Sequence, residues 1–236
     1  MSEIPVIAIE RLDLRFAPRP WRFADERRPA IDAHFAALRR DKPALWNGRV
    51  LLLHHYELSA GRLSGAYLET DFASFIAWRD WGWPDRSMHN CFGLAALRAA
   101  DGAFLLGVMA EHTANAGRIY FPGGTPDPDD VFDGTVDIGA NVFRELAEET
   151  GLGAADVAVE PGWHATLTGQ RIGLVKTVQS PLPAETLRDR VRGFLARQAE
   201  PELADVRIVR GPQDFDPLMP NFVTAFLGHM WHRADP

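Results

Sequence analysis

The stretch that decides the fold runs from Arg144 to Leu152 and reads Arg-Glu-Leu-Ala-Glu-Glu-Thr-Gly-Leu. An α-helix turns once every 3.6 residues, so Glu145, Glu148 and Glu149 stand at i, i+3 and i+4 and share one face. Three like charges on one face repel one another. The ordinary interpretation is a solvated helix face, on which Arg144 and Glu148 form an ion pair that contributes about 0.3 kcal/mol.

The residues around this stretch favour a functional interpretation. A helix is expected from Asp137 to Thr150, and Gly151 should end it as a left-handed cap. Upstream, Phe121-Pro122-Gly123-Gly124 follows a predicted strand, and glycines let a backbone approach a ligand closely. By composition alone, a match to Arg-Glu-x-x-Glu-Glu-x-Gly is expected on the order of once in several thousand such chains. Strand, glycine loop, acidic helix and glycine cap in this order therefore indicate a site.

This arrangement resembles the signature of the Nudix hydrolase family, and the half from Arg144 to Leu152 matches at every position. The first half departs from the family pattern, because the earlier glutamate would fall at Val136 and the loop from Gly124 to Arg144 is longer than usual. The resemblance implies an enzyme that uses Mg²⁺ or Mn²⁺. It also implies the residues of the site: a metal held by Glu145, Glu148, Glu149 and the carbonyl of Gly124, with Arg144 orienting a glutamate and Arg144, Glu145, Glu148 and Glu149 as the catalytic set.

The chemistry of Mg²⁺ agrees with these residue types. The ion takes hard oxygen ligands and shares one or two carboxylates with substrate phosphates. A bound cation offsets the charge on a leaving phosphate and lowers the pKa of a bound water, after which a nearby carboxylate only has to accept a proton. Glu145 is the first choice for that base within the helix. Late acids such as Glu200, Glu202 and Asp205 could supply a further base, and surface exposure is the favoured interpretation of each. The expected activity is hydrolysis of a diphosphate linkage in a nucleoside diphosphate derivative.

The substrate is predicted from weaker signals. The stretches Ala44 to Gly48 and Thr70 to Phe72, with the long loop after the glycines, resemble the Nudix subgroup that acts on UDP-glucose and UDP-galactose. Coenzyme A derivatives are the next alternative. Three residues are expected to bind substrate: Arg118 as a phosphate ligand, Trp81 as a stacking platform for a base, and Gly123. For Trp81, packing between helix and sheet is the competing interpretation. For Arg118, it is a solvated arginine at a strand edge.

Composition limits the partners and the location. The chain has 236 residues, 46% of them hydrophobic, with a formal net charge of -7, so it can bury a sizeable core but has no basic excess for nucleic acid. Cys91 is the single cysteine and cannot form an internal disulfide. The segment Met1 to Pro5 has no basic start before an apolar run, and no uncharged run is long enough for a bilayer. We expect a cytoplasmic protein without nucleic-acid or membrane partners; a homo-oligomer stays open.

The expected fold is α/β (α+β), a Nudix-type α/β/α sandwich with a mixed sheet in residues 89–236, preceded by an α+β segment in residues 1–88. Periodicity, capping residues and turn residues place the elements. Helices are expected at residues 25–40, 72–81, 137–150, 184–199 and 220–231. Strands are expected at residues 6–9, 12–16, 49–55, 62–70, 91–97, 103–109, 118–121, 163–167, 171–178 and 206–209, and a loop at residues 122–133.

Two other classes of function remain open at this point. Val136 in place of a glutamate favours a catalytically inactive Nudix-like module that binds or senses a nucleotide ligand. A structural or interaction protein whose acidic helix is only a solvated face is the third possibility. The chain contains neither a Gly-x-Ser-x-Gly nor a His-Glu-x-x-His motif, which argues against serine hydrolase and zinc protease chemistry.

Overall fold

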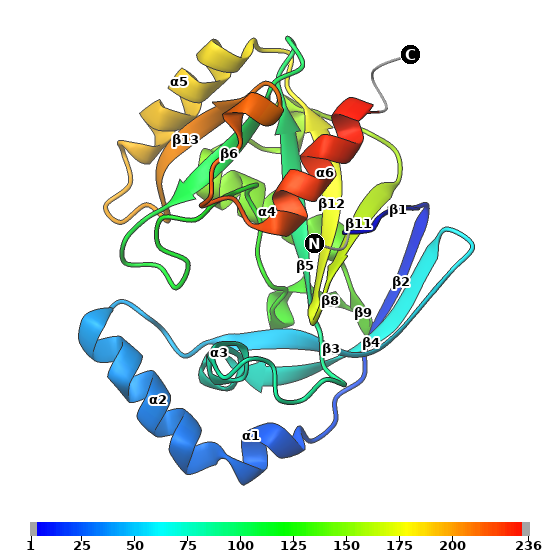
Figure 1. Cartoon of the computed structure of the whole chain (residues 1–236), viewed down its shortest axis with the longest axis vertical. Coiled ribbons are helices and arrows are strands. Elements are labelled where there is room, and N and C mark those ends of the chain that lie inside the picture. The colour runs from blue at the N-terminus through cyan, green and yellow to red at the C-terminus, as the bar shows by residue number, and fades with distance from the viewer. Residues whose placement is uncertain (1–3, 233–236) are drawn as a thin grey trace.

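A computed structural model describes residues 4–232, which form two mixed β-sheets and six α-helices (Figure 1). The expected mixed α/β fold is confirmed. The main sheet lies between helices on both faces, and the second sheet lies beneath it with its own helices. In the described part of the chain, no helix combines the length and the apolar character that a membrane span needs.

The main sheet has the strand order β1-β11-β12-β5-β6-β13, with β10 paired to β12 and β7 paired to β6. Only β5 and β12 run parallel; the other pairs are antiparallel. The strands are β1 (Val6–Ile9), β5 (Asn90–Arg98), β6 (Phe104–Met109), β7 (Ile119–Tyr120), β10 (Ala158–Val159), β11 (Trp163–Thr168), β12 (Arg171–Gln179) and β13 (Leu203–Val209).

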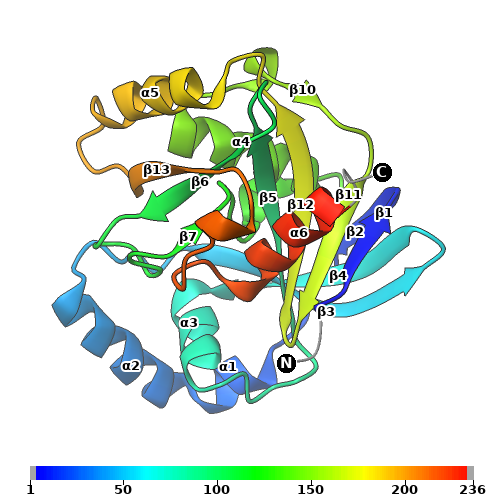
Figure 2. The same ribbon diagram turned by 45° about the horizontal axis from the view of Figure 1, so that its top comes forward.

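Helices cover both faces of the main sheet and bury its apolar side chains. Helices α4 (Ile138–Thr150) and α5 (Ala184–Leu195) pack on one face, where Val142, Leu146, Leu187 and Val191 are fully buried. Helix α6 (Asn221–His232) covers the other face with Phe222, Val223 and Phe226. Figure 2 shows α6 in front of the sheet and α4 behind it. This alternation of inward-facing side chains on both faces explains why β5 reads as a continuous apolar run.

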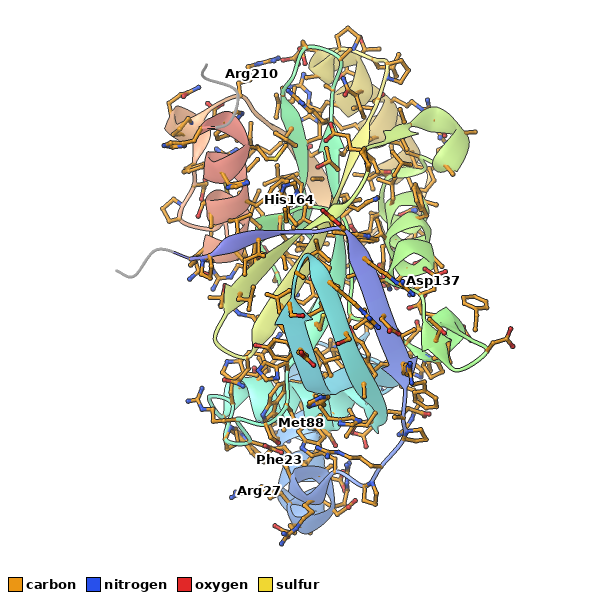
Figure 3. All side chains as sticks on the ribbon, turned by 90° about the vertical axis from the view of Figure 1, so that its right-hand side faces the viewer. Phe23, Arg27, Met88, Asp137, His164 and Arg210 are labelled. Carbon is orange, nitrogen blue, oxygen red and sulfur yellow. The ribbon has the colours of Figure 1, made fainter. Side chains whose placement is uncertain are left out.

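The second sheet has the order β3-β4-β2-β9-β8, and three helices pack beside it. Its strands are β2 (Arg11–Phe16), β3 (Arg49–Ser59), β4 (Arg62–Asp71), β8 (Val131–Phe132) and β9 (Thr135–Val136), and the helices are α1 (Arg22–Glu26), α2 (Arg28–Asp41) and α3 (Phe72–Asp80). Phe23 and Met88, labelled in Figure 3, belong to the aromatic-rich cluster between these helices and the sheet. Asp71 caps α3, accepting a 2.7 Å hydrogen bond from the Ser74 N–H.

The residues before and after residue 88 each contribute strands to both sheets. Strand β1 pairs with β11 at the edge of the main sheet, in register Val6 to Thr166. Strand β9 joins β2 in the second sheet, where Arg15 pairs with Thr135. The division into residues 1–88 and 89–236 stays a prediction, and the two sheets are joined by exchanged strands.

Two expectations about local structure were wrong. The single helix expected at residues 25–40 is two helices, because Pro29 has no N–H to donate and stands in the first turn of α2, leaving Arg27 as the break. The loop expected at residues 122–133 contains a 3-10 turn at Pro128–Asp130 and the strand β8, which forms a hairpin with β9. The hairpin turns at Asp133 and Gly134, both with positive φ.

Candidate active site

Helix α4 forms as the sequence predicts and carries three glutamates of very different exposure. Asp137 caps it by accepting a 2.9 Å hydrogen bond from the Ala140 N–H, and Gly151 ends it with φ 70°. Glu149 is 4% exposed, the Glu145 side chain 14% and the Glu148 side chain 58%. The structure therefore brings Glu145 and Glu149 into the protein and leaves Glu148 facing solvent.

The glycine loop lies directly against these two glutamates. The Gly123 N–H donates a hydrogen bond to the Glu149 carboxylate. A Cβ at Gly124 would overlap the Glu145 carboxylate, whose Cδ is 2.7 Å from that position. The Gly124 carbonyl, expected to help hold a metal, accepts a long hydrogen bond of 3.3 Å from the Gly93 N–H. The loop thus binds the carboxylates through its backbone and leaves no room for a side chain at Gly124.

Burial and mutual repulsion keep these carboxyl groups weakly acidic. Burial raises the pKa of Glu145 to about 7, with Arg144 opposing the rise and Glu148, Glu202 and Asp130 adding to it. Burial also raises the pKa of Glu149 well above its ordinary value, and Glu145 and Glu202 raise it further. The Glu149 Oε2 atom is buried and has no hydrogen-bond partner among residues 4–232. The sequence named Glu202 only as one of several late acids; the structure places its charge beside the pair.

Arg144 connects the helix to the loop that follows the glycines. Its guanidinium lies 3.0 Å from Asp130 Oδ2, 3.3 Å from Asp127 Oδ2, 3.3 Å from Glu145 Oε1 and 3.2 Å from Glu148 Oε2. The predicted role of Arg144 in orienting a glutamate stays a prediction, and its ion pair with Glu145 has the geometry that this role requires. One cation between four carboxylates fixes the side of the helix that faces the loop.

Sequence analysis missed Asp130. Its side chain is 3% exposed and accepts hydrogen bonds from Arg144 Nη2 at 3.0 Å, Asn141 Nδ2 at 2.9 Å and the Asp127 N–H at 3.0 Å. Val136, the position at which the family pattern has a glutamate, is 3% exposed and packs in the apolar core. A buried carboxylate therefore does face Arg144, but it comes from Asp130. The available signal was the run Asp127-Pro128-Asp129-Asp130, whose spacing fits a capped turn.

Tyr120 also lies beside the carboxylates and was not predicted. Burial raises the pKa of its hydroxyl, and the charges of Glu149, Glu202 and Glu145 raise it further. The Tyr120 hydroxyl accepts a 3.1 Å hydrogen bond from Asn115 Nδ2. Tyr120 is thus a neutral hydrogen-bonding group at the edge of the carboxylate cluster, held by the loop between β6 and β7.

The three residues expected to bind substrate lie in different surroundings. Gly123 is in contact with Glu149, as described above. Arg118 is exposed and directly precedes β7. The Trp81 ring packs 5.8 Å from the Phe23 ring and 5.7 Å from the His34 ring, among the helices of the second sheet. Its stacking on a base stays a prediction, and packing accounts for its present position.

The carboxylate cluster fits a divalent cation in chemistry, although its side chains are not in a ligating arrangement. Across residues 4–232, no three Asp, Glu, His or Cys side chains stand in a geometry that would hold a metal ion. Glu145 and Glu149 nevertheless are hard oxygen donors that repel each other, and Glu149 Oε2 has no partner. A cation between them would remove the repulsion and satisfy that oxygen, so the residues present fit Mg²⁺ or Mn²⁺.

A cavity of about 550 Å³ lies elsewhere, between α5 and β13. Its lining arginines are all paired with carboxylates: Arg188 with Glu185, Arg192 with Asp205, Arg207 with Asp216 and Arg210 with Asp101. Charges that already neutralise one another give no reason to expect a ligand. The carboxylate cluster on α4 is the better candidate.

No family model matches the chain, and no curated protein matches it. Solved structures show partial likeness. A Nudix hydrolase from M. smegmatis is 18% identical over 63% of this chain and 88% of its own, with a TM-score of 0.41. The MutT protein from Methanosarcina mazei Go1 is 19% identical over 63% of this chain and 96% of its own, with a TM-score of 0.42. A bifunctional NMN adenylyltransferase/ADP ribose pyrophosphatase from Francisella tularensis is 15% identical over 67% of this chain and 45% of its own, with a TM-score of 0.43.

Proposed function

We propose that this chain is a Nudix-type hydrolase that cleaves a diphosphate linkage in a nucleoside diphosphate derivative with the help of Mg²⁺ or Mn²⁺. One observation carries the proposal: Glu145 and Glu149 are buried together against the Gly123-Gly124 loop, and Glu149 Oε2 has no partner. Burying two like-charged carboxylates together is costly to a fold, even with Arg144 3.3 Å from Glu145. A site that binds a cation and a phosphate gives a reason for both.

The residues of this chain have separate roles in the proposed reaction. Glu145, Glu149 and, after rotation of its exposed side chain, Glu148 would hold the cation, with the Gly124 carbonyl as a further oxygen. When bound, the cation would supply charge neutralisation at the phosphates and a more acidic water. Arg144 holds Glu145 in place. Glu145, whose pKa is about 7 before any cation binds, is suited to accept a proton near neutral pH.

For the substrate, we propose a UDP-sugar first and a coenzyme A derivative second. Two observations support this choice. The stretches 44–48 and 70–72 resemble the UDP-sugar subgroup. The second sheet and its helices α1, α2 and α3, together called the second layer, supply surface next to the glycine loop. The Leu51 N–H donates a 2.7 Å hydrogen bond to the Pro126 carbonyl, so this layer contacts the loop directly.

We propose a cytoplasmic location for the protein. A reducing compartment suits Cys91, a buried thiol whose pKa burial raises to about 12.

The alternative is a nucleotide-binding module without activity. Val136 favours it, because the family's earlier glutamate is absent and an apolar side chain fills the core there. Asp130 weighs against it, since a buried carboxylate still holds Arg144. An inactive module would also have no need for two buried glutamates that repel each other.

The test is release of phosphate-containing products from UDP-glucose, UDP-galactose, ADP-ribose, coenzyme A and NADH, with Mg²⁺ or Mn²⁺. Wild type, Glu149→Gln and Glu57→Gln are compared, and Glu57 is a matched control because it is an exposed glutamate on β3. We expect metal-dependent turnover that falls by at least about a hundredfold in Glu149→Gln and is unchanged in Glu57→Gln. Folding is checked by circular dichroism, and the neutral amide should not weaken the fold.

Each outcome has a defined meaning. Turnover of one compound names the substrate. Metal binding by calorimetry without turnover of any compound would replace the hydrolase by the binding module. Equal turnover by wild type and Glu149→Gln would remove the glutamate pair from the chemistry.

A further inference from the structure

Three arginines come from distant parts of the chain to the side of the main sheet that faces α3. Arg79 lies on α3, Arg118 precedes β7 and Arg171 begins β12. Asn115 connects the first two: its side chain accepts a 3.2 Å hydrogen bond from Arg79 Nη1, and its carbonyl accepts a 3.0 Å hydrogen bond from the Arg118 N–H. Figures 1 and 2 both show the loop between β6 and β7 on the α3 side of the main sheet.

Arg171 reaches the same region from the other direction. Its guanidinium lies 5.5 Å from the centre of the Phe222 ring, at the start of α6. The segment that leads into α6 is bonded to β7, because the Leu218 carbonyl accepts a 3.2 Å hydrogen bond from the Ile119 N–H, next to Arg118. Burial lowers the pKa of Arg171, and the charges of Arg118 and Arg79 lower it further, so both of these cations repel Arg171.

The charges of this cluster are poorly balanced within the described residues. Between residues 4 and 232, neither Arg118 nor Arg171 has a carboxylate within ion-pair distance, while Arg79 is 2.9 Å from Asp80. An exposed arginine is stabilised by water, but Arg171 is half-buried and loses part of that hydration. Two unpaired guanidinium groups and a third beside them, in a protein of net charge -7, have the composition of an anion site.

Hydrogen bonds connect this arginine cluster to Tyr120, at the edge of the carboxylate cluster. Arg79 donates to Asn115, and Asn115 in turn donates to the hydroxyl of Tyr120. The charge of Glu149 raises the pKa of that hydroxyl. The arginines therefore lie one side chain beyond the edge of the carboxylate cluster, on the side of the second layer. An acidic cluster with a cation can bind only part of a diphosphate, and its negative charge repels the rest.

We propose that Arg79, Arg118 and Arg171 form an anion site that binds the phosphate group of the substrate lying farther from α4. The identification with substrate rests on the proposed function; the anion site itself does not. Guanidinium groups bind phosphate through paired hydrogen bonds, and three of them can surround one phosphate. Arg79 gives the second layer a defined part in this site: it supplies one of the three cations.

The experiment measures binding of inorganic pyrophosphate and of inorganic phosphate to the full chain by calorimetry in EDTA, without any divalent metal. Arg171→Gln, Arg118→Gln and Arg79→Gln are compared with Arg40→Gln, a matched control because Arg40 is exposed at the end of α2. We expect the Kd for pyrophosphate to rise at least about tenfold in Arg171→Gln and Arg118→Gln, and less than about twofold in Arg40→Gln. Arg118 is exposed, so its variant keeps the test valid if Arg171→Gln fails to fold.

Equal Kd values in all variants would overturn the anion site, and so would absence of pyrophosphate binding to the wild type at about 10 mM. The measurement is independent of turnover. Arginine-dependent pyrophosphate binding without hydrolysis of any substrate would refute the proposed function and keep the anion site. Hydrolysis with the same KM in wild type and Arg171→Gln would keep the function and refute the assignment of the anion site to the substrate.

Discussion

Arg144 is the residue on which the geometry of the site depends, because it bridges the helix that carries the glutamates and the loop that follows the glycines. Of the carboxylates around it, Asp130 is the one that water hardly reaches, at 2% exposure. A guanidinium that has lost part of its hydration needs a fixed partner. Asp130 is therefore expected to position Arg144, and through it Glu145, without touching substrate.

Asp130→Asn should lower the free energy of unfolding by about 1–3 kcal/mol, because an amide cannot accept all the hydrogen bonds that the buried carboxylate accepts from Arg144 and two other donors. Metal affinity and kcat should fall as well, since Glu145 loses its fixed neighbour. Urea unfolding and calorimetry with Mn²⁺ measure the two effects. Asp129→Asn is the control, an exposed neighbour in the same turn. Asp130→Glu separates positioning from mere stability: if it restores the fold and leaves metal binding weak, the position of the carboxylate matters.

Among the elements, α4 and the glycine loop act as one unit, and they show what a sequence can reveal. The helix itself and its left-handed end at Gly151 are local features, so periodicity and turn residues predicted them and the structure has them. The predicted common face is divided by burial, because Glu148 faces solvent. The contact between Asp130 and Arg144 spans a loop of irregular backbone, and no periodic pattern marks such a contact. The pairing of β9 with β2 is longer still in sequence and had no local signal.

No local sequence pattern predicted the arginine cluster either. Arg118 attracted notice because it precedes the glycine loop, whereas Arg79 and Arg171 have ordinary neighbours in the sequence. Only the fold brings the three arginines within range of one another's charge. Pro29 is the opposite case: the signal that splits α1 from α2 stood in the sequence, and the apolar period from Ile31 onward outweighed it.

The two adjacent glycines should respond differently to alanine. Gly123 has φ 156°, and a Cβ there would overlap the Gly93 carbonyl and lie 2.9 Å from Leu94 Cα, so Gly123→Ala should destabilise the fold by about 3 kcal/mol or more. At Gly124 the overlapping atoms belong to the Glu145 side chain, which can rotate away. Gly124→Ala should keep most of the stability and lose metal-dependent turnover. Thermal unfolding and the turnover assay together test this pair; equal thermal stability of both variants would contradict the backbone argument.

For the molecule as a whole, the exchanged strands matter more than the division at residue 88. Removing residues 1–88 takes β1 from the edge of β11 and leaves β8 and β9 without the strand to which they pair. It also exposes the apolar side chains that Leu51, Leu53 and Tyr67 cover in the shared core.

We expect the chain of residues 89–236 to be unfolded or aggregated. The measurement is its circular dichroism and proton NMR dispersion beside those of the full chain. A folded, metal-binding fragment as active and as selective as the full chain would contradict both the structural argument and the proposed role of the second layer in substrate selection.

The strand exchange also affects the order in which a growing chain can fold on the ribosome. Strands β2, β3 and β4 are synthesised early, yet their sheet is complete only after β9 has left the ribosome at Val136. Strand β1, made before the other described strands, must wait for β11, whose last residue is Thr168. The first apolar segments of this protein are thus made long before their partners, and their protection during synthesis falls to chaperones or to non-native contacts.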